Sequence, residues 1–197
     1  MLAPTAMRRP ANAAIRHWGD PTRMMRIKGG AVVPPFFRGA DRAMLRAMNK
    51  LSFDTPTGRF TLVESDDQIV AAGWGMEEGS KASPLLVAAQ SQIMRYFSHD
   101  LQVFDLPLKM AGGLTGQVGA LMLAIPLGET RTYGDLARDL AMPAQAIGQA
   151  CGANPIPLII PCHRILSASG LGGFSGAGGV ETKVALLRHE RAAGLLI

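Results

Sequence analysis

The feature that most constrains this chain is an apolar run punctuated by prolines at residues 154–165, Asn-Pro-Ile-Pro-Leu-Ile-Ile-Pro-Cys-His-Arg-Ile. Residues 158–160 are apolar and largely β-branched, which predicts a short buried strand. Pro161 has no amide hydrogen with which to continue a ladder of backbone hydrogen bonds, so we expect the chain to turn there. The turn presents Cys162, which a histidine and an arginine follow directly.

The chemistry of this segment depends on the state of one thiol. A thiol is a good nucleophile only as the thiolate, which needs a base or a positive charge nearby. His163 and Arg164 are of the types that supply both. Adjacent residues on a strand point to opposite faces, so a base role for His163 requires turn or helical geometry, or a bridging water. The alternative is a buried, inert Cys162 beside a histidine that only fills space.

Composition excludes several classes of protein. With 197 residues, of which 48% are hydrophobic, the chain can bury one good core or two small ones. It has no apolar run of about 18 residues, so we predict no membrane span. Cys151 and Cys162 do not make a disulfide framework, and no Cys or His spacing suits a metal. We therefore expect a cytoplasmic protein without a metal or another cofactor.

The positive charge of the chain is concentrated at its beginning. Residues 1–47 carry nine Lys and Arg against two Asp, a surplus of +7, whereas the remainder carries 11 basic and 13 acidic residues, or −2. A basic segment of this kind suggests a transit peptide or a DNA-binding arm. We interpret it instead as a disordered or partly ordered extension, with Met48 as a plausible start, because it shows no periodicity of a packed element.

Residues 48–110 predict a small structural α/β unit. Three runs of alternating apolar residues between 51 and 74, separated by turn signals, indicate an antiparallel meander. Ser83 followed by Pro84 predicts the start of a helix. Its apolar residues lie at helical spacing: Leu85, Leu86, Ala89, Ile93 and Phe97. Residues 104–108 predict a last short strand, and nothing in the unit suggests chemistry of its own.

Residues 111–197 predict a mostly helical unit that begins at a Gly-Gly pair. Apolar residues at 118–125 have helical spacing. Thr132, with Asp135 three residues later, predicts a helix that starts in a capping box. A second helix over 144–152 follows after a Met-Pro pair, so the two form a helix-turn-helix.

The second of these helices has small side chains where a recognition helix usually has long ones. They are Ala144, Ala146, Gly148, Ala150 and Gly152. Long side chains are needed to read base edges in a wide major groove, whereas a bare helix suits a close approach to a narrow minor groove. The alternative is that alanine and glycine only permit tight packing inside the protein.

Several motifs together resemble one family. Pro-Cys-His-Arg-Ile at 161–165, preceded by Asn-Pro and followed by Gly-Phe-Ser-Gly at 173–176, is similar to the active-site signature of the O6-alkylguanine-DNA alkyltransferases, also called methylated-DNA–protein-cysteine methyltransferases. The likeness extends through Ile-Pro-Leu-Gly-Glu-Thr-Arg-Thr-Tyr-Gly-Asp-Leu-Ala at 125–137 and Leu-Leu-Arg-His-Glu at 186–190. It covers about residues 50–192.

The resemblance implies an α+β fold, with a small ribonuclease-H-like domain of antiparallel sheet and helix before a domain with a winged helix-turn-helix. It implies that the catalytic residues are Cys162, His163, Glu190 and Tyr133. It implies substrate contacts by Ser175, Ile165, Phe174 and Asn154. It implies DNA contacts by Gln145, Ala146, Gly148, Gly134 and Arg164.

The resemblance also implies a mechanism. A guanine alkylated at O6 is rotated out of the duplex through the minor groove and held by the carbonyls of Cys162 and Ile165. His163, oriented by Glu190, deprotonates the thiol through a water, the sulfur takes the alkyl group, and Tyr133 protonates the leaving base. A thioether does not hydrolyse, so each molecule acts once, as a monomer on double-stranded DNA.

Further roles and simpler alternatives accompany this mechanism. The amide of Asn154 is expected to bind backbone as a hinge, and Arg164 to brace the fold. The alternatives are that Glu190 is a solvated residue of a closing helix over 181–191, and that Tyr133 only caps the core.

Two departures from the family pattern bear on function. Gln145 stands where the family usually has an arginine that fills the gap left by the base, so base flipping should be weaker. Leu114, Gly116 and Gly119 replace a Phe-Gln pair and a Trp, and the glycines should loosen their helix. The competing interpretation is a divergent relative that binds lesions without efficient transfer. A cysteine hydrolase is disfavoured because no oxyanion motif accompanies the thiol.

Overall fold

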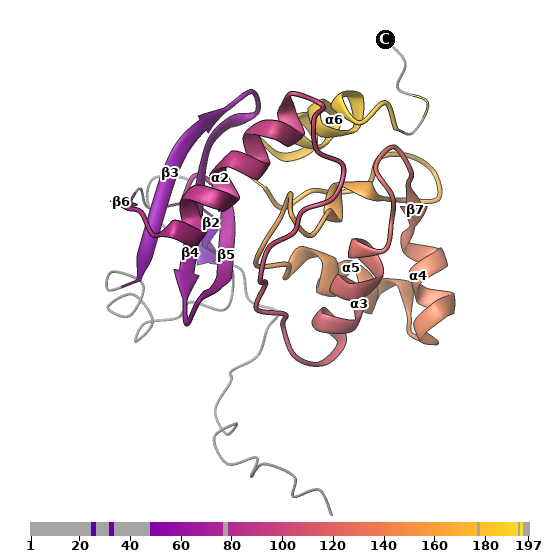
Figure 1. Cartoon of the computed structure of the whole chain (residues 1–197). Coiled ribbons are helices and arrows are strands. Elements are labelled where there is room, and N and C mark those ends of the chain that lie inside the picture. Colours follow the sequence, from indigo (N-terminus) through magenta and orange to yellow (C-terminus); the bar gives the residue numbers. More distant parts are fainter. Residues whose placement is uncertain are drawn as a thin grey trace, which may run out of the picture.

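The computed structural model describes residues 48–76, 79–176, 178–192 and 194. It also describes the backbone of two short antiparallel strands, β1 (Met25–Arg26) and β2 (Val32–Val33) (Figure 1). The rest of the basic extension predicted over residues 1–47 lies outside the described residues.

A four-stranded antiparallel sheet forms the first half of the molecule, in the order β5-β4-β3-β6. The strands are β3 (Asn49–Thr55), β4 (Gly58–Ser65), β5 (Gln68–Trp74) and β6 (Ser80–Lys81). Asp66 and Asp67 join β4 to β5 with φ of 53° and 56°, the backbone of a two-residue hairpin turn. The predicted meander is confirmed.

Helix α2 (Pro84–Phe97) covers one face of this sheet (Figure 1). The hydroxyl of Ser83 caps it by accepting a hydrogen bond from the amide of Leu86 at 3.1 Å, and Pro84 occupies the first turn, as predicted. Its buried stripe includes the predicted Leu86, Ala89 and Ile93, and it continues to Tyr96. The sequence had given no role to this tyrosine.

The strand predicted over residues 104–108 is wrong. The segment makes a single parallel bridge, between Leu108 and Ile69 on β5. The amide of Ile69 donates to the carbonyl of Pro107 at 2.8 Å, and the amide of Lys109 donates to the carbonyl of Ile69 at 2.9 Å. Pro107 has no amide hydrogen with which to extend the ladder, so the contact does not grow into a strand.

The second half is mostly helical, and two of its short segments pair as parallel strands. Its elements are α3 (Gly113–Leu123), β7 (Arg131–Thr132), α4 (Tyr133–Leu140), α5 (Ala144–Gly152), the 3₁₀ turn η1 (Cys162–Arg164), β8 (Ile165–Leu166) and α6 (Gly179–His189). The capping box predicted for α4 is present, because Thr132 and Asp135 bond each other's backbone amides. Ala141, with φ of 50°, ends α4 before α5 begins.

The two unusual glycines of α3 have a packing role that the sequence did not suggest. A Cβ at Gly116 would collide with the carbonyl oxygen of Ala111, and one at Gly119 would lie 3.1 Å from the terminal methyl of Met110. The segment leading into α3 therefore folds back against the helix. The glycines allow this close approach, besides lowering the intrinsic helix propensity.

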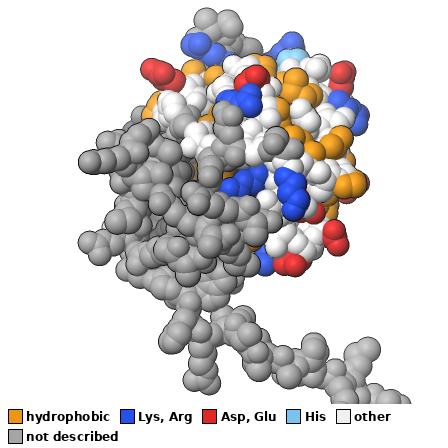
Figure 2. All heavy atoms as spheres, turned by 90° about the vertical axis from the view of Figure 1, so that its left-hand side faces the viewer, with side chains coloured by type: hydrophobic (Ala, Val, Ile, Leu, Met, Phe, Trp, Pro, Cys, Tyr) orange, Lys and Arg blue, Asp and Glu red, His pale blue; other side chains and the backbone are white. Residues whose placement is uncertain are grey.

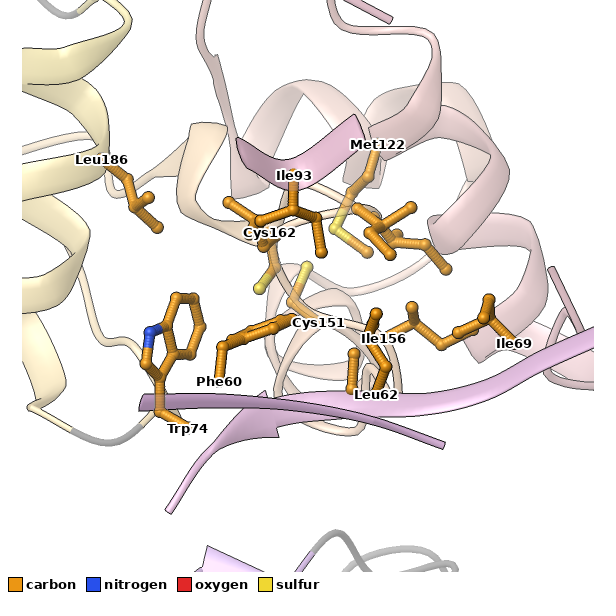
Figure 3. Packing of buried hydrophobic residues seen from close by; sticks show 14 of the residues in the cluster. Phe60, Leu62, Ile69, Trp74, Ile93, Met122, Cys151, Ile156, Cys162 and Leu186 are labelled. Carbon is orange, nitrogen blue, oxygen red and sulfur yellow. The ribbon is translucent and has the colours of Figure 1, made fainter. Parts of the chain in front are cut away.

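One contiguous hydrophobic core joins the two halves. Figure 3 shows Phe60 and Leu62 of the sheet and Ile93 of α2 packed around the same centre as Cys151 and Cys162. Figure 2, which faces the sheet side, shows basic and acidic side chains interspersed on the surface that is not grey. None of the helices in the described part of the chain combines the length and apolar character needed to cross a bilayer.

Candidate active site

The cysteine is presented by a tight turn, and the strand predicted at residues 158–160 is wrong. Leu158 has a φ of 75° although it is buried, which is an uncommon backbone conformation for a residue with a branched side chain. The amide of Ile160 donates to the carbonyl of Ile156 at 2.9 Å, and that of Cys162 donates to the carbonyl of Ile160 at 2.9 Å. Pro161 then leads into η1, so the expected turn before Cys162 is present.

Asn154 holds this turn closed. Its Nδ2 donates to the carbonyl of Ile160 at 2.8 Å, and its Oδ1 accepts from the amide of Ile156 at 3.1 Å. The predicted bonding of this amide to backbone is therefore present. Because Asn154 lies two residues after the end of α5, it ties that helix to the segment that carries Cys162.

Cys162 is buried, with 7% of the residue exposed, and its thiol is neutral at rest. Burial raises the pKa of the thiol, while the side chain of Asn154 and the positive charge of Lys183 oppose that rise. The resting nucleophile is thus a thiol that must lose its proton during reaction.

His163, Arg164 and Glu190 form a buried network beside the thiol. His163 Nε2 lies 2.8 Å from Glu190 Oε1. Arg164 donates twice to the same carboxylate, from Nη2 to Oε1 and from Nε to Oε2, both at 2.9 Å, and from Nη1 to the carbonyl of Ile125 at 2.6 Å. The bidentate pairing explains how three polar side chains are accommodated inside the core.

The network fixes the tautomer of His163. Burial alone would raise the pKa of Glu190, but the hydrogen bonds from His163 and Arg164 outweigh it and lower that pKa to about 2. An ionised carboxylate only accepts hydrogen bonds, so His163 donates from Nε2. Burial lowers the pKa of His163, so the ring is neutral and Nδ1 carries a lone pair. Nδ1 is buried and has no hydrogen-bond partner among the described residues, which leaves it available to accept a proton.

Tyr96 adds a fourth member to this network, one that the sequence analysis missed. Its hydroxyl donates to Glu190 Oε1 at 2.8 Å. A residue of the unit predicted to be structural therefore contacts this network directly. A signal was present, because Tyr96 follows the apolar stripe of α2 and a hydroxyl in a core needs a partner.

Lys183 is a second buried residue that the sequence analysis missed. Its Nζ donates to the carbonyls of Ile165 at 2.6 Å and Gly173 at 3.3 Å. Burial lowers the pKa of Lys183, and the nearby thiols of Cys162 and Cys151 oppose this. The signal was a lysine three residues before Leu186, on the apolar face of α6.

Strand pairing brings Tyr133 to the same site. Parallel pairing of β7 with β8 places Thr132, which precedes Tyr133, opposite Leu166. Burial raises the pKa of the Tyr133 hydroxyl, and the neighbouring thiols of Cys151 and Cys162 raise it further, so the hydroxyl keeps its proton at neutral pH. Tyr133 is half-buried, so its placement also fits the simpler role of covering the core.

The loop with Phe174 and Ser175 closes over this region. The ring of Phe174 packs edge-on against Trp74 of β5, with centroids 6.1 Å apart. Gly172 has a φ of 69°, and a Cβ there would lie 3.2 Å from the ring of Tyr133. Ser175 is half-buried in the same loop. The loop is thus placed beside Tyr133 by a position that only glycine occupies without strain.

The residues predicted to contact DNA divide into two groups. Gln145 and Gly134 are exposed, while Ala146 and Gly148 are partly exposed on α5. A Cβ at Gly148 would meet nothing within 4 Å, so packing does not require glycine at that position. Arg164 is only 6% exposed and is fully engaged by Glu190 and a backbone carbonyl. These bonds agree with its predicted bracing role, and its predicted contact with DNA stays a prediction.

Glu190 is likewise not a solvated residue, since it is 3% exposed. It follows directly after α6, which ends at His189. Within the described residues, no group of three His, Cys, Asp or Glu side chains is arranged to hold a metal ion.

Comparison with known proteins places this geometry in a family. Residues 114–192 match the family model described as "6-O-methylguanine DNA methyltransferase, DNA binding domain". The methylated-DNA–protein-cysteine methyltransferase of Mycobacterium tuberculosis (strain ATCC 25618 / H37Rv) is 43% identical over 108 residues, which are 53% of this chain and 64% of that protein. This alignment spans just under two thirds of the relative.

Other alignments extend further. The protein of the same name from Mycolicibacterium paratuberculosis is 35% identical over 154 residues, which cover 70% of this chain and 89% of the relative. The constitutive enzyme of Bacillus subtilis is 33% identical over 153 residues, or 70% and 92% of the two chains.

Solved structures agree with these alignments. The crystal structure of the M. tuberculosis O6-methylguanine methyltransferase superposes with a TM-score of 0.66 at 33% identity, covering 73% of this chain and 93% of that one. The same enzyme "in complex with DNA" gives a TM-score of 0.64 at 35% identity, covering 73% and 94%. With its cysteine turn, its His-Glu-Arg network and these similarities over most of the length of several relatives, this chain belongs to the methylated-DNA–protein-cysteine methyltransferase family.

Proposed function

We propose that this protein repairs DNA by moving an alkyl group from O6-alkylguanine to Sγ of Cys162, in a reaction that each molecule performs once. The observation that carries the proposal is the neutral His163, whose Nε2 is bonded to Glu190 and whose buried Nδ1 has no hydrogen-bond partner among the described residues. A buried thiol followed directly by such a base is suited to nucleophilic attack. An inert structural cysteine needs no such arrangement.

The proposed step begins with proton transfer. The Cys162 thiol gives its proton through one water to Nδ1 of His163, and Glu190 stabilises the imidazolium that forms. The thiolate attacks the alkyl carbon, so a carbon–sulfur bond forms as the carbon–oxygen bond to O6 breaks. Tyr133, which keeps its proton at neutral pH, gives a proton to the leaving guanine and later regains one from solvent. The products are a thioether and an unmodified guanine.

The proposed recognition requires the damaged base to leave the stack. Among the described residues, the carbonyl of Cys162 accepts from the Ile165 amide and that of Ile165 accepts from Lys183, and a carbonyl oxygen has a second lone pair that would bind the base. Ser175 and Phe174 would line the remaining sides. Asn154 would keep the recognition helix and the nucleophile in register, which is the predicted hinge role.

We further propose that α4 and α5 form a helix-turn-helix that enters the minor groove, with the segment around β7 and β8 as its wing. The open space beside Gly148 supports this, because a bare helix surface that packing does not require is free to approach a DNA backbone. The finer assignments, a ribonuclease-H-like domain over 48–110, a reactive domain over 111–197, a monomer and a cytoplasmic location, belong to the same proposal.

One observation favours the second candidate function, lesion binding without efficient transfer. Gln145 is exposed on α5 but brings no charge where the family usually has an arginine. A glutamine hydrogen-bonds the orphaned base but attracts no phosphate, so flipping is weaker.

Peptide mass spectrometry separates the two candidates. The protein is mixed with duplex DNA containing one O6-methylguanine, digested, and compared with protein mixed with undamaged duplex. Transfer predicts one added methyl group on the peptide containing Cys162, absent in Cys162→Ser. Cys151→Ser is the matched control, since it removes the other cysteine and should leave the modification in place. Unmodified protein that still retains the damaged duplex would establish the second candidate instead.

A further inference from the structure

We infer that Tyr96 is a positioning residue for the proposed transfer, because its hydroxyl holds the carboxylate of Glu190 that orients His163. The inference rests on the proposed function. It assigns a share of the reaction's machinery to α2, which lies in the half of the chain predicted to be structural.

The geometry places Tyr96 in direct competition with His163. Glu190 Oε1 accepts from Tyr96 at 2.8 Å, from His163 at 2.8 Å and from Arg164 at 2.9 Å. A carboxylate oxygen has about two lone-pair directions, so three donors share its charge. The strength of the bond to His163 therefore depends on how much of that charge Tyr96 takes.

The hydroxyl cannot easily leave this position. Tyr96 is 1% exposed. Its ring lies against Phe97, Phe104 and His189, with centroids 5.0, 5.6 and 4.8 Å away. Its backbone carbonyl also accepts from Nε2 of His189 at 2.9 Å, which ties the end of α2 to the end of α6. The donor is thus fixed by packing on one side and by backbone contact on the other.

The consequence for His163 follows from charge sharing. A donor to Oε1 reduces the negative charge that His163 feels, and Glu190 is the group that raises the pKa of His163 against the effect of burial. Removing the Tyr96 donor therefore strengthens the Glu190–His163 interaction and makes the imidazole more basic. Other titratable groups surround the same cluster. Arg164 and Lys183 act on His163, Cys162 acts on Lys183, and His99 stacks on His189. None of them is altered by Tyr96→Phe.

The sign of the effect on rate is fixed by the role of the base. Transfer requires neutral His163, so its rate rises with pH as the imidazolium loses its proton. A more basic His163 moves this rising limb to higher pH. In Tyr96→Phe we expect the rising limb to move by roughly 0.5–1 pH unit to higher pH. At a pH on that limb, the transfer rate should then be about 3–10-fold lower than in the unsubstituted protein.

The matched control is Phe104→Leu. It loosens the packing around the ring of Tyr96 but leaves the hydroxyl in place. If Tyr96 only fills space, both variants lower the thermal midpoint of unfolding and neither moves the pH profile. Site-specific 3-fluorotyrosine at position 96 makes the hydroxyl a stronger hydrogen-bond donor, so it should move the rising limb of the pH–rate profile to lower pH. This variant also tests the inference if Tyr96→Phe folds poorly.

The deciding experiment measures the pKa of His163 by NMR titration alongside single-turnover transfer on O6-methylguanine duplex. We expect the pKa of His163 to rise in Tyr96→Phe. In Phe104→Leu we expect it to stay within about 0.2 unit of the value in the unsubstituted protein, which is the precision required of the titration. An unchanged pKa in Tyr96→Phe overturns the inference. Absence of transfer by the unsubstituted protein overturns the proposed function instead, and the titration still decides the role of Tyr96.

Discussion

Replacing Glu190 with glutamine tests the buried network most severely. The side chain is 3% exposed and accepts four hydrogen bonds, two of them from Arg164. Glutamine has nearly the same shape but carries an NH₂ group in place of one acceptor oxygen. In Glu190→Gln at least one donor therefore faces another donor, and the buried guanidinium of Arg164 loses its counter-charge.

The magnitude follows from two independent arguments. Breaking a buried ion pair by neutralising one partner costs about 3–5 kcal/mol of unfolding free energy. The pKa of Glu190 is lowered from 4.5 to about 2, which at about 1.4 kcal/mol per unit corresponds to a stabilisation of about 3.5 kcal/mol. The pKa is depressed in the folded state, so this contribution is complete above pH 4.5 and is lost as the pH falls towards 2.

Urea unfolding at a series of pH values measures both effects. We expect the unfolding free energy of Glu190→Gln to be about 3–5 kcal/mol lower at pH 7. We also expect it to fall less steeply with decreasing pH, because the contribution of Glu190 to acid destabilisation is absent. Glu129→Gln, at an exposed position, is the control and should resemble the unsubstituted protein. If Glu190→Gln is too unstable for its urea curve to be fitted, the loss of stability of the unsubstituted protein at acidic pH still tests the contribution of Glu190. Equal stability of Glu190→Gln and Glu129→Gln at pH 7 would refute it.

Two further substitutions probe α5. Gln145→Arg restores the charge found in the family, so we expect faster single-turnover transfer on duplex DNA. The salt dependence of binding should also become steeper by about one phosphate contact. No change would mean that residue 145 does not enter the stack. Gly148→Ala fills open space, so it should raise the unfolding free energy by about 0.5–1 kcal/mol. It should also weaken DNA binding in a titration, and undiminished affinity would argue against close approach of this helix to the minor groove.

Features with local causes were predicted well from the sequence. Ser83 and Pro84 mark the start of α2, and Thr132 with Asp135 marks that of α4, because capping and the fixed φ of proline act within a few residues. The antiparallel meander follows from alternating apolar residues between turns. The site residues came from the motif, and the structure gathers His163 and Arg164, which follow Cys162, around the carboxylate of Glu190.

Features that depend on distant contacts were missed or mistaken. Leu158 adopts a positive φ because hydrogen bonds and Asn154 close the turn around it, and no local preference of leucine suggests this. Tyr96 lies 94 residues from Glu190 in sequence, and Lys183 bonds backbone 10 and 18 residues away. The bidentate pairing of Arg164 with Glu190 joins residues 26 apart in sequence, and no local pattern around Arg164 indicates it.

The most direct test of the central claim is the intact mass of the protein after incubation with an increasing excess of O6-methylguanine duplex. We predict that the mass rises by one methyl group per molecule and then stays constant, while only an equal number of lesions is repaired, because the thioether at Cys162 cannot be reversed. Repair of several lesions per molecule by a protein whose mass is unchanged would contradict the account.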